Sequence, residues 1–152
     1  MKSLDHSLKY LIEQTPEDFI RFGAGNPSIQ VVGPLPVALP ARGRDVDAGY
    51  QATVDGIAAV VHVEFHRRHQ SLLELAIDVA EAQIRFFRRE RLPVLSHVWD
   101  LYGSVDDPLL EDHTLKFGLQ TGTSSVYRRI NLKAIRARTL LEQAPPSLWP
   151  LV

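Results

Sequence analysis

Two acidic residues in a predicted β-hairpin are the side chains of this 152-residue chain whose spacing most clearly suggests chemistry. Asp55-Gly56 lies between two runs of β-forming residues, and Asp-Gly is a strongly favoured two-residue hairpin loop. With that loop, Asp47 lies directly opposite Glu64 on the paired strands. The Cβ atoms of such a pair are roughly 4.5–5.5 Å apart, and like charges at this distance destabilise a hairpin. A divalent cation between the carboxylates, or a proton on one of them, would relieve the repulsion.

The alternation of apolar and polar residues supports this pairing, because one face of the hairpin is then wholly apolar. That face pairs Val46 with Phe65, Ala48 with Val63, Tyr50 with Val61 and Ala52 with Ala59. The other face pairs Asp45 with His66, Asp47 with Glu64, Gly49 with His62 and Gln51 with Val60. A second interpretation of the acids stays open: both lie on a solvated sheet face, where neighbouring Arg and His side chains relieve their charge.

Two histidines share the predicted strand face with Glu64. His62, Glu64 and His66 form a His-x-Glu-x-His pattern that, together with Asp47, has the donor types of a zinc or iron site. All-β metal barrels use strand histidines in this way. The long helix predicted over 70–90 argues against such a barrel in this chain.

The residues around the hairpin resemble the PD-(D/E)XK nuclease superfamily, and within it the recombination-promoting nuclease and putative transposase group. The resemblance lies in Leu39-Pro40, the Arg44–Asp47 segment and His62-Val63-Glu64-Phe65-His66. It implies that Asp47 and Glu64 bind Mg²⁺ or Mn²⁺ on a restriction-endonuclease-like α/β core, and that DNA is the substrate. Relatives in this group tend to continue beyond a Leu-x-Pro-Leu like that at the end of this chain, so the resemblance also implies a shortened member.

Two departures from the family pattern leave the activity open. His66 occupies the position where the superfamily has Lys and this group often has Gln, and Leu72–Ala76 replaces an Arg-Met-Leu-x-Tyr type of sequence. One interpretation is a metal-dependent DNA endonuclease with Asp47, Glu64 and His66 as catalytic residues. The alternative is a catalytically inactive domain that acts as a binding or oligomerisation module, for example as a homodimer.

Further charged residues are candidates for the same site. The superfamily often adds a helix acid to its metal site, which makes Glu13 a candidate, although a solvated helix face is the more common explanation for such a residue. Phosphate contacts are expected from Arg44, Arg128, Arg129 and Lys133. The last three belong to a basic stretch without aromatic residues, for which a charged outer face is the simpler explanation.

Periodicity and turn residues predict one mixed α/β domain over residues 1–152, with an antiparallel acid-bearing hairpin flanked by helices. Helices are predicted over 3–14, from 15 to about 22, over 70–90 and over 136–143. Strands are predicted over 93–102, 114–119 and 127–135, with a proline-rich connector over 28–41 and an acidic loop over 103–112. The strand over 93–102 should run parallel to a hairpin strand, because the long helix forms a crossover between them. The helix over 70–90 is expected to face the sheet through Leu72, Leu73, Ala76, Ile77, Ala80, Ile84 and Phe87.

Composition narrows the remaining classes. A hydrophobic content of 45% with 23% charged residues is ordinary for a globular protein. The net charge of −1 gives no general attraction to nucleic acid, so DNA binding would depend on local basic patches. The chain has no cysteine, which excludes disulfides and thiolate metal sites and fits a cytoplasmic location. Neither a signal peptide nor a membrane-spanning segment is predicted.

Overall fold

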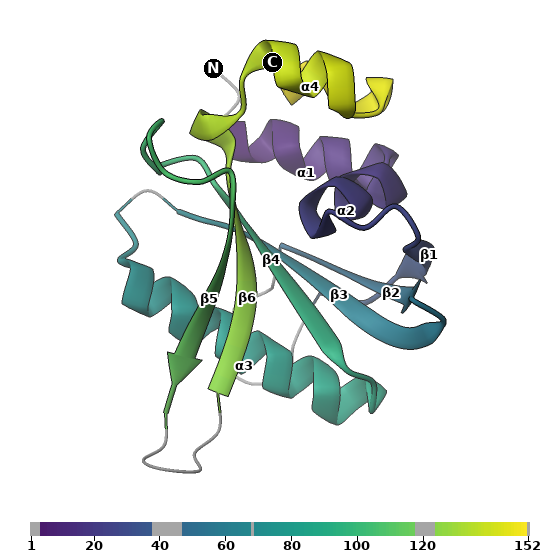
Figure 1. Ribbon diagram of the computed structural model, residues 1–152. Helices are drawn as coiled ribbons and strands as arrows, with labels where there is room; N and C mark the ends of the chain where they lie inside the picture. Colours follow the sequence, from purple (N-terminus) through teal and green to yellow (C-terminus); the bar gives the residue numbers. More distant parts are fainter. Residues whose placement is uncertain (1–3, 38–46, 68, 118–123, 152) are drawn as a thin grey trace.

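The computed structural model describes residues 4–37, 47–67, 69–117 and 124–151, which form three layers (Figure 1). A six-stranded sheet lies between helix α3 on one face and helices α1, α2 and α4 on the other. The helices are α1 (Leu4–Gln14), α2 (Pro16–Ala24), α3 (Leu72–Glu90) and α4 (Ala137–Gln143). The strands are β1 (Gln30–Pro34), β2 (Ala48–Val54), β3 (Ile57–Phe65), β4 (Val94–Asp100), β5 (Leu110–Lys116) and β6 (Ser124–Asn131). Two short 3₁₀ helices, η1 (Leu132–Ala134) and η2 (Pro146–Leu151), flank α4.

The sheet is mixed, with the strand order β1-β2-β3-β4-β6-β5. Strands β3, β4 and β6 are parallel neighbours, whereas β1, β2 and β5 join by antiparallel pairing. Helix α3 is the crossover between β3 and β4, as predicted. The carboxyl ends of β3, β4 and β6 therefore lie along one edge of the sheet. The coarse prediction, a mixed sheet with an antiparallel hairpin and flanking helices, is confirmed.

The predicted hairpin is confirmed with its loop and its register. Asp55 and Gly56 have φ angles of 50° and 80°, and positive φ at both central residues is the requirement of a type I′ turn. The observed partners include Ala48 with Val63, Tyr50 with Val61, Ala52 with Ala59 and Val54 with Ile57. The predicted pairs that involve Asp45 and Val46 lie outside the described residues.

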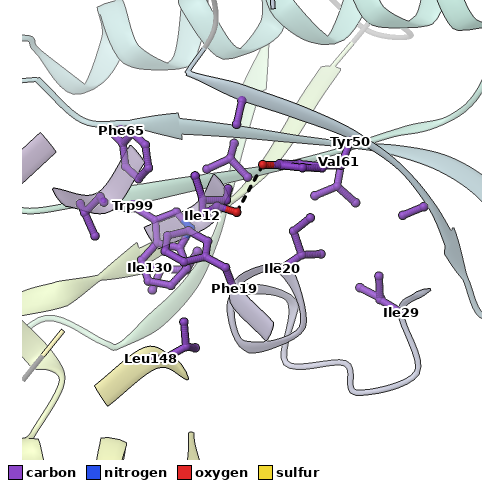
Figure 2. Close-up of a cluster of buried hydrophobic side chains, with 14 of the residues drawn as sticks. Ile12, Phe19, Ile20, Ile29, Tyr50, Val61, Phe65, Trp99, Ile130 and Leu148 are labelled. Atoms are coloured by element: carbon purple, nitrogen blue, oxygen red, sulfur yellow. Dashed lines mark hydrogen bonds between the residues drawn. The ribbon is translucent and has the colours of Figure 1, made fainter. Parts of the chain in front are cut away.

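The larger core lies between the sheet and helices α1 and α2 (Figure 2). Strand β3 contributes Val61, Val63 and Phe65 to it, which are the residues predicted for the apolar face. Phe19 of α2 lies against Trp99, with their ring centroids 3.9 Å apart. Leu148 of η2 is also fully buried in this core, so the end of the described chain closes the layer.

Helix α3 forms as predicted but faces the sheet with a different side. It begins with a capping box, in which the Ser71 side chain accepts from the Glu74 backbone amide and Glu74 accepts from that of Ser71. The buried side chains are those of Leu75, Ala76, Val79, Ala80, Ala82 and Phe86. The predicted sheet-facing residues Leu72, Leu73, Ile77, Ile84 and Phe87 are exposed, so that prediction was wrong for all but Ala76 and Ala80.

The position of Phe86 gives a physical reason for this orientation. Its ring lies over Gly49 of β2, where an added Cβ atom would come within 2.6 Å of the ring. The glycine thus provides the space into which the helix docks, and a smaller Ala82 one turn earlier lets α3 approach the sheet. The aromatic ring at 86, rather than the one at 87, is therefore the residue that fills the interface.

Element boundaries differ from the predictions most clearly at three places. The strand predicted over 127–135 is β6, which spans Ser124–Asn131, and Leu132–Ala134 form the 3₁₀ helix η1 instead. Part of the proline-rich connector forms the edge strand β1, which ends at Pro34, where a missing amide is tolerated. Strand β5 begins at Leu110, inside the predicted acidic loop, because Glu111 and Asp112 pair with arginines of β6. Among the described residues, no helix is long and apolar enough to cross a membrane.

Candidate functional site

The predicted pair of acids lies where the hairpin approaches the carboxyl end of β3. The last pair of the observed register is Ala48 with Val63. Asp47 directly precedes Ala48 and Glu64 directly follows Val63, so the two acids are the next neighbours across the hairpin. Asp47 directly precedes β2, and its Oδ2 atom accepts a hydrogen bond of 2.8 Å from the Phe65 backbone amide. Glu64 is 4% exposed and shares the α3 side of β3 with His62. The hairpin thus places both carboxylates at the same corner of the sheet.

Electrostatics around Asp47 combine a repulsive and an attractive neighbour. Burial and the negative charge of Glu64 raise the pKa of Asp47, although Lys9 and the Phe65 amide partly offset them. Lys9, on α1, lies with its Nζ atom 2.7 Å from Asp47 Oδ1. The side chain of Lys9 is 40% exposed and that of Asp47 only 7%, so the pair closes the site toward solvent. The sequence offered one signal for this contact, the Lys at position 9 on the polar side of a predicted helix.

Glu64 has two weaker neighbours. Its Oε2 atom lies 3.4 Å from His62 Nε2, and its Oε1 atom lies 3.4 Å from Arg67 Nη2. The Arg67 side chain is 48% exposed. An exposed guanidinium therefore stands beside a buried carboxylate at the end of β3, although Arg67 was not among the predicted phosphate contacts.

His66 has a hydrogen-bond acceptor at each ring nitrogen. Its Nδ1 atom lies 2.8 Å from Asp100 Oδ1, and its Nε2 atom lies 2.9 Å from the Gln70 carbonyl oxygen. A carboxylate and a carbonyl only accept, so the ring satisfies both by carrying a proton on each nitrogen. The hydrogen bond with Asp100 raises the pKa of His66, against burial, which lowers it. His66 is therefore a positively charged group at the position where the resemblance places Lys.

Asp100, at the end of β4, connects His66 with a buried arginine. Burial raises the pKa of Asp100, but hydrogen bonds from His66, the Tyr102 amide and Arg129 outweigh it and hold that pKa far below its usual range. Arg129 Nε lies 2.7 Å from Asp100 Oδ2, and Arg129 Nη2 lies 3.2 Å from Asp107 Oδ2. The charges alternate along this chain of contacts, so each buried ion has a partner. Sequence analysis missed Asp100, because its contact with His66 depends on the parallel register of β3 and β4.

A second polar network runs under α3. His62 Nδ1 lies 3.0 Å from Ser96 Oγ, which accepts a hydrogen bond of 3.0 Å from Gln83 Nε2. Ser125 Oγ in turn donates to Gln83 Oε1 over 2.6 Å. Ser96, His62 and Glu64 are together in the manner of a hydrolase triad, but His62 is 0% and Ser96 is 3% exposed. Because the serine and the histidine are both buried, we assign this network a structural role.

The other predicted site residues pair with other acids or lie at the surface. Arg128 and Arg129 are neighbours on β6 and point to opposite faces of the sheet. Arg128 forms a two-pronged contact with Asp112, at 2.7 and 3.0 Å, and also donates to the Ala24 carbonyl. Lys133 of η1 and Glu13 of α1 are both exposed. Arg44 lies outside the described residues.

The chemistry of the donors decides which metal the site suits. Within the described ranges, no group of three or more His, Asp or Glu side chains is arranged to hold a metal ion. Both ring nitrogens of His66 are engaged, which counts against the His-x-Glu-x-His zinc or iron arrangement. Two oxygen donors, Asp47 and Glu64, remain. Mg²⁺ is typically held by one or two carboxylates together with waters and substrate phosphates, so this pair fits Mg²⁺ or Mn²⁺ chemically.

Comparisons with protein-family models, curated proteins and solved structures give no match to this chain. The function is therefore argued from the geometry of the site.

Proposed function

We propose that this protein is a metal-dependent nuclease that hydrolyses phosphodiester bonds in DNA, with Asp47 and Glu64 as its metal ligands. One observation carries the proposal: a hairpin holds two buried carboxylates so close that the charge of Glu64 contributes to the raised pKa of Asp47. Folding brings two like charges together, which costs free energy, and a bound cation would offset that cost. The resemblance of this segment to PD-(D/E)XK nucleases gives the same two residues. A restriction-endonuclease-like core, with the acid-bearing hairpin followed by a crossover helix and a parallel strand, is part of the proposal.

Mg²⁺ or Mn²⁺ bound at this pair would neutralise phosphate charge and lower the pKa of a bound water. Asp47 would turn one carboxylate oxygen to the ion while Oδ2 keeps its hydrogen bond from the Phe65 amide. That bond holds the carboxylate in one rotamer, which is what a ligand needs before the ion arrives. In the net reaction, water adds across one P–O ester bond and leaves a phosphate on one end and a hydroxyl on the other.

Positive charge near the scissile phosphate would come from two groups of this chain. Lys9 contacts Asp47 Oδ1 at 2.7 Å and is partly exposed, so its ammonium can exchange the carboxylate for a phosphate oxygen. Arg67 is exposed beside Glu64 and can contact the DNA backbone. His66 is fixed by Asp100 and Gln70, and its role would be to hold charge close to Glu64 rather than to move. Lys133 and Arg44 remain proposed phosphate contacts.

The test is cleavage of supercoiled plasmid DNA by freshly purified protein with Mg²⁺ or Mn²⁺. We expect nicking that the near-isosteric variants Asp47→Asn and Glu64→Gln each reduce by ~100-fold or more, because each removes a metal ligand. Glu142→Gln is the matched control, since it neutralises an exposed acid of α4 and should cleave like the wild type. Cleavage that persists in both site variants would refute the assignment.

His66→Lys tests the departure from the family pattern. Lysine restores the residue type implied by the resemblance and keeps a positive charge beside Asp100. We expect nicking to be preserved or raised. A loss of nicking in a variant that keeps the wild-type circular dichroism spectrum would show that the imidazole has a role of its own.

A second candidate function follows from the same contacts. Lys9 already neutralises Asp47, and His66 is locked between two acceptors, which is the pattern of a catalytically inactive domain that serves as a binding or oligomerisation module. Wild-type protein that neither nicks DNA nor binds Mn²⁺ in calorimetry would favour this function over the nuclease.

A further inference from the structure

Helix α3 carries two apolar faces, and only one of them is buried by the described parts of the chain. The inner face, which includes Leu75, Val79, Ala82 and Phe86, is buried against the sheet. On the far side, Leu73, Ile77, Ile84 and Phe87 are exposed by 62, 44, 51 and 52%. We refer to these four residues with the buried Ala80 as the outer stripe. A surface helix normally turns charged and polar residues to solvent, so an apolar row of this length indicates a contact surface.

The spacing of the outer stripe identifies the kind of contact. From Leu73 to Ile77, Ala80, Ile84 and Phe87 the steps alternate between four and three residues. This is the a/d repeat of a coiled-coil seam, in which one helix packs along another with side chains interdigitating. Ala80, in the middle of the row, is the smallest member and only 5% exposed, so the four large exposed side chains around it would make the contacts with an opposite helix. The expected partner is therefore another helix with a matching apolar seam.

Charge decides which helix that is. The first two-thirds of α3 carries Glu74, Asp78 and Glu81 and no basic residue, whereas Arg85, Arg88, Arg89 and Arg91 gather at its end with Glu90. Within the helix, Arg85 contacts Glu81 and Arg89 contacts Glu90. An antiparallel copy of α3 would bring the acidic part of each helix beside the basic part of the other. A parallel copy would place like charges together. The helix is thus complementary in charge and in shape to itself, but only in the antiparallel direction.

We propose that two copies of this protein associate through their α3 helices, packed antiparallel along the outer stripe around a two-fold axis. Such an interface is self-complementary, as two-fold symmetry requires. In the register with its axis near the helix centre, Ile77 of one copy faces Phe87 of the other, and Ala80 faces Ile84. Glu81 of each copy then lies on the same flank as Arg88 of the other. The dimer holds with or without nuclease activity, because Asp47 and Glu64 take no part in it.

The mass in solution tests the dimer. Light scattering on the full chain at ~100 µM, a concentration at which micromolar affinities are saturated, should give twice the 17.1 kDa chain mass. Ile77→Lys and Ile84→Lys should each give the monomer mass with an unchanged circular dichroism spectrum, since both positions are exposed within one chain. Val32→Lys is the matched control on the exposed edge strand and should remain dimeric. A monomeric wild type would overturn the proposal, even if another protein binds the outer stripe. Dimers that persist in both α3 variants would overturn it as well.

A charge exchange tests the antiparallel direction. Glu81→Lys and Arg88→Glu each place like charges across an antiparallel seam, so each variant alone should dimerise roughly tenfold more weakly than the wild type. Mixed together, they restore both attractive pairs and should form a one-to-one heterodimer of wild-type affinity. In a parallel pair, residue 81 would face 81 and residue 88 would face 88. Glu81→Lys would then leave the affinity unchanged, and that result would overturn the antiparallel arrangement.

Discussion

The two faces of the central strands are buried in opposite ways. Toward α1 and α2, strands β3, β4 and β6 present Phe65, Trp99 and Ile130, which pack into one apolar core. Toward α3, alternate residues of the same strands are largely polar, and seven of them are buried: His62, Glu64, Ser96, Asp100, Ser125, Arg129 and Asn131. His66, directly after β3, is buried on this side as well. On the apolar face, every contact that excludes water stabilises the fold. The α3 face also has apolar clusters, in which Val60 packs with Phe86 and Val98 with Val79. Its ionic groups, however, stabilise the fold only where each buried charge meets a partner of opposite sign.

This difference between the faces explains why the candidate site lies on the α3 side. Aromatic side chains hold the strands rigidly from one side, which fixes the positions of the ionic groups on the other. The polar groups specify one register of the parallel strands, because a shift of one residue would leave charges unpaired. Substitutions on the two faces should therefore lower the stability of the protein in different ways.

Truncation of the apolar face should have the largest effect. Phe19 is fully buried against Phe65 and Trp99, so Phe19→Ala leaves a cavity and should lower the free energy of unfolding by about 3–5 kcal/mol. Tyr10→Ala, on the exposed side of α1, should change it by less than about 0.5 kcal/mol. Urea denaturation measures both. Equal effects of the two variants would contradict the placement of the core.

On the α3 face, the most costly change should be Asp100→Asn. It keeps the shape but removes the charge shared by His66 and Arg129, and loss of one partner of a buried ion pair should lower the free energy of unfolding by about 3 kcal/mol. The comparison is with Asp106→Asn, at an exposed position of the following loop, which should be nearly neutral. If Asp100→Asn unfolds at the wild-type urea concentration, the network contributes no stability.

His97 provides a pH-dependent difference between the faces. It lies on the apolar side, where its Nδ1 atom is buried and has no hydrogen-bond partner among the described residues. Burial, with smaller effects of Arg128 and His62, lowers the pKa of His97 to about 4. Below pH 6.5 the unfolded chain takes up a proton that the folded chain refuses, so the wild type loses stability as pH falls toward 4. His97→Leu should remove this loss and be more stable than the wild type by about 2 kcal/mol at pH 5, relative to pH 7.5.

His66, on the α3 side, should show the opposite sign. Its pKa is raised, so its contribution is complete below the ordinary value and is lost as pH rises through the folded value. His66→Gln should therefore flatten the alkaline side of the stability profile, whereas His97→Leu flattens the acid side. Thermal unfolding across pH 4–9 distinguishes the two, and a change on the same side for both variants would contradict the account.

Removal of the Lys9 ammonium should have the smallest effect on stability. Lys9 is partly exposed, so solvent screens its ion pair with Asp47, and Lys9→Ala should lower the free energy of unfolding by about 1 kcal/mol or less. Without the ammonium, the remaining influences on Asp47 raise its pKa further. Loss of carboxylate ionisation in Lys9→Ala should thus begin at higher pH than in the wild type, which NMR titration of Asp47 measures.

Much of the hairpin could be predicted from the sequence because its information is local. Asp55-Gly56 sets the loop, and strict alternation sets which side chains share a face. The position of Asp47 beside Glu64 followed directly from these two features. The crossover helix and the parallel strand β4 followed from chain length and connection rules.

The orientation of α3 could not be predicted because both of its sides are apolar. Periodicity favoured the side with Leu73, Ile77, Ile84 and Phe87, yet Phe86 has a complementary site over Gly49, far away in the sequence. The contact of His66 with Asp100 has the same origin. The two residues are 34 positions apart, and only the register between β3 and β4 brings them together.

Mn²⁺ binding measured by isothermal titration calorimetry tests most directly whether Asp47 and Glu64 form a divalent-metal site. The wild type should bind Mn²⁺ at a site that Asp47→Asn and Glu64→Gln each abolish and that the α4 surface variant Glu142→Gln retains. Absence of binding in the wild type, or the same affinity in both site variants, would contradict the account.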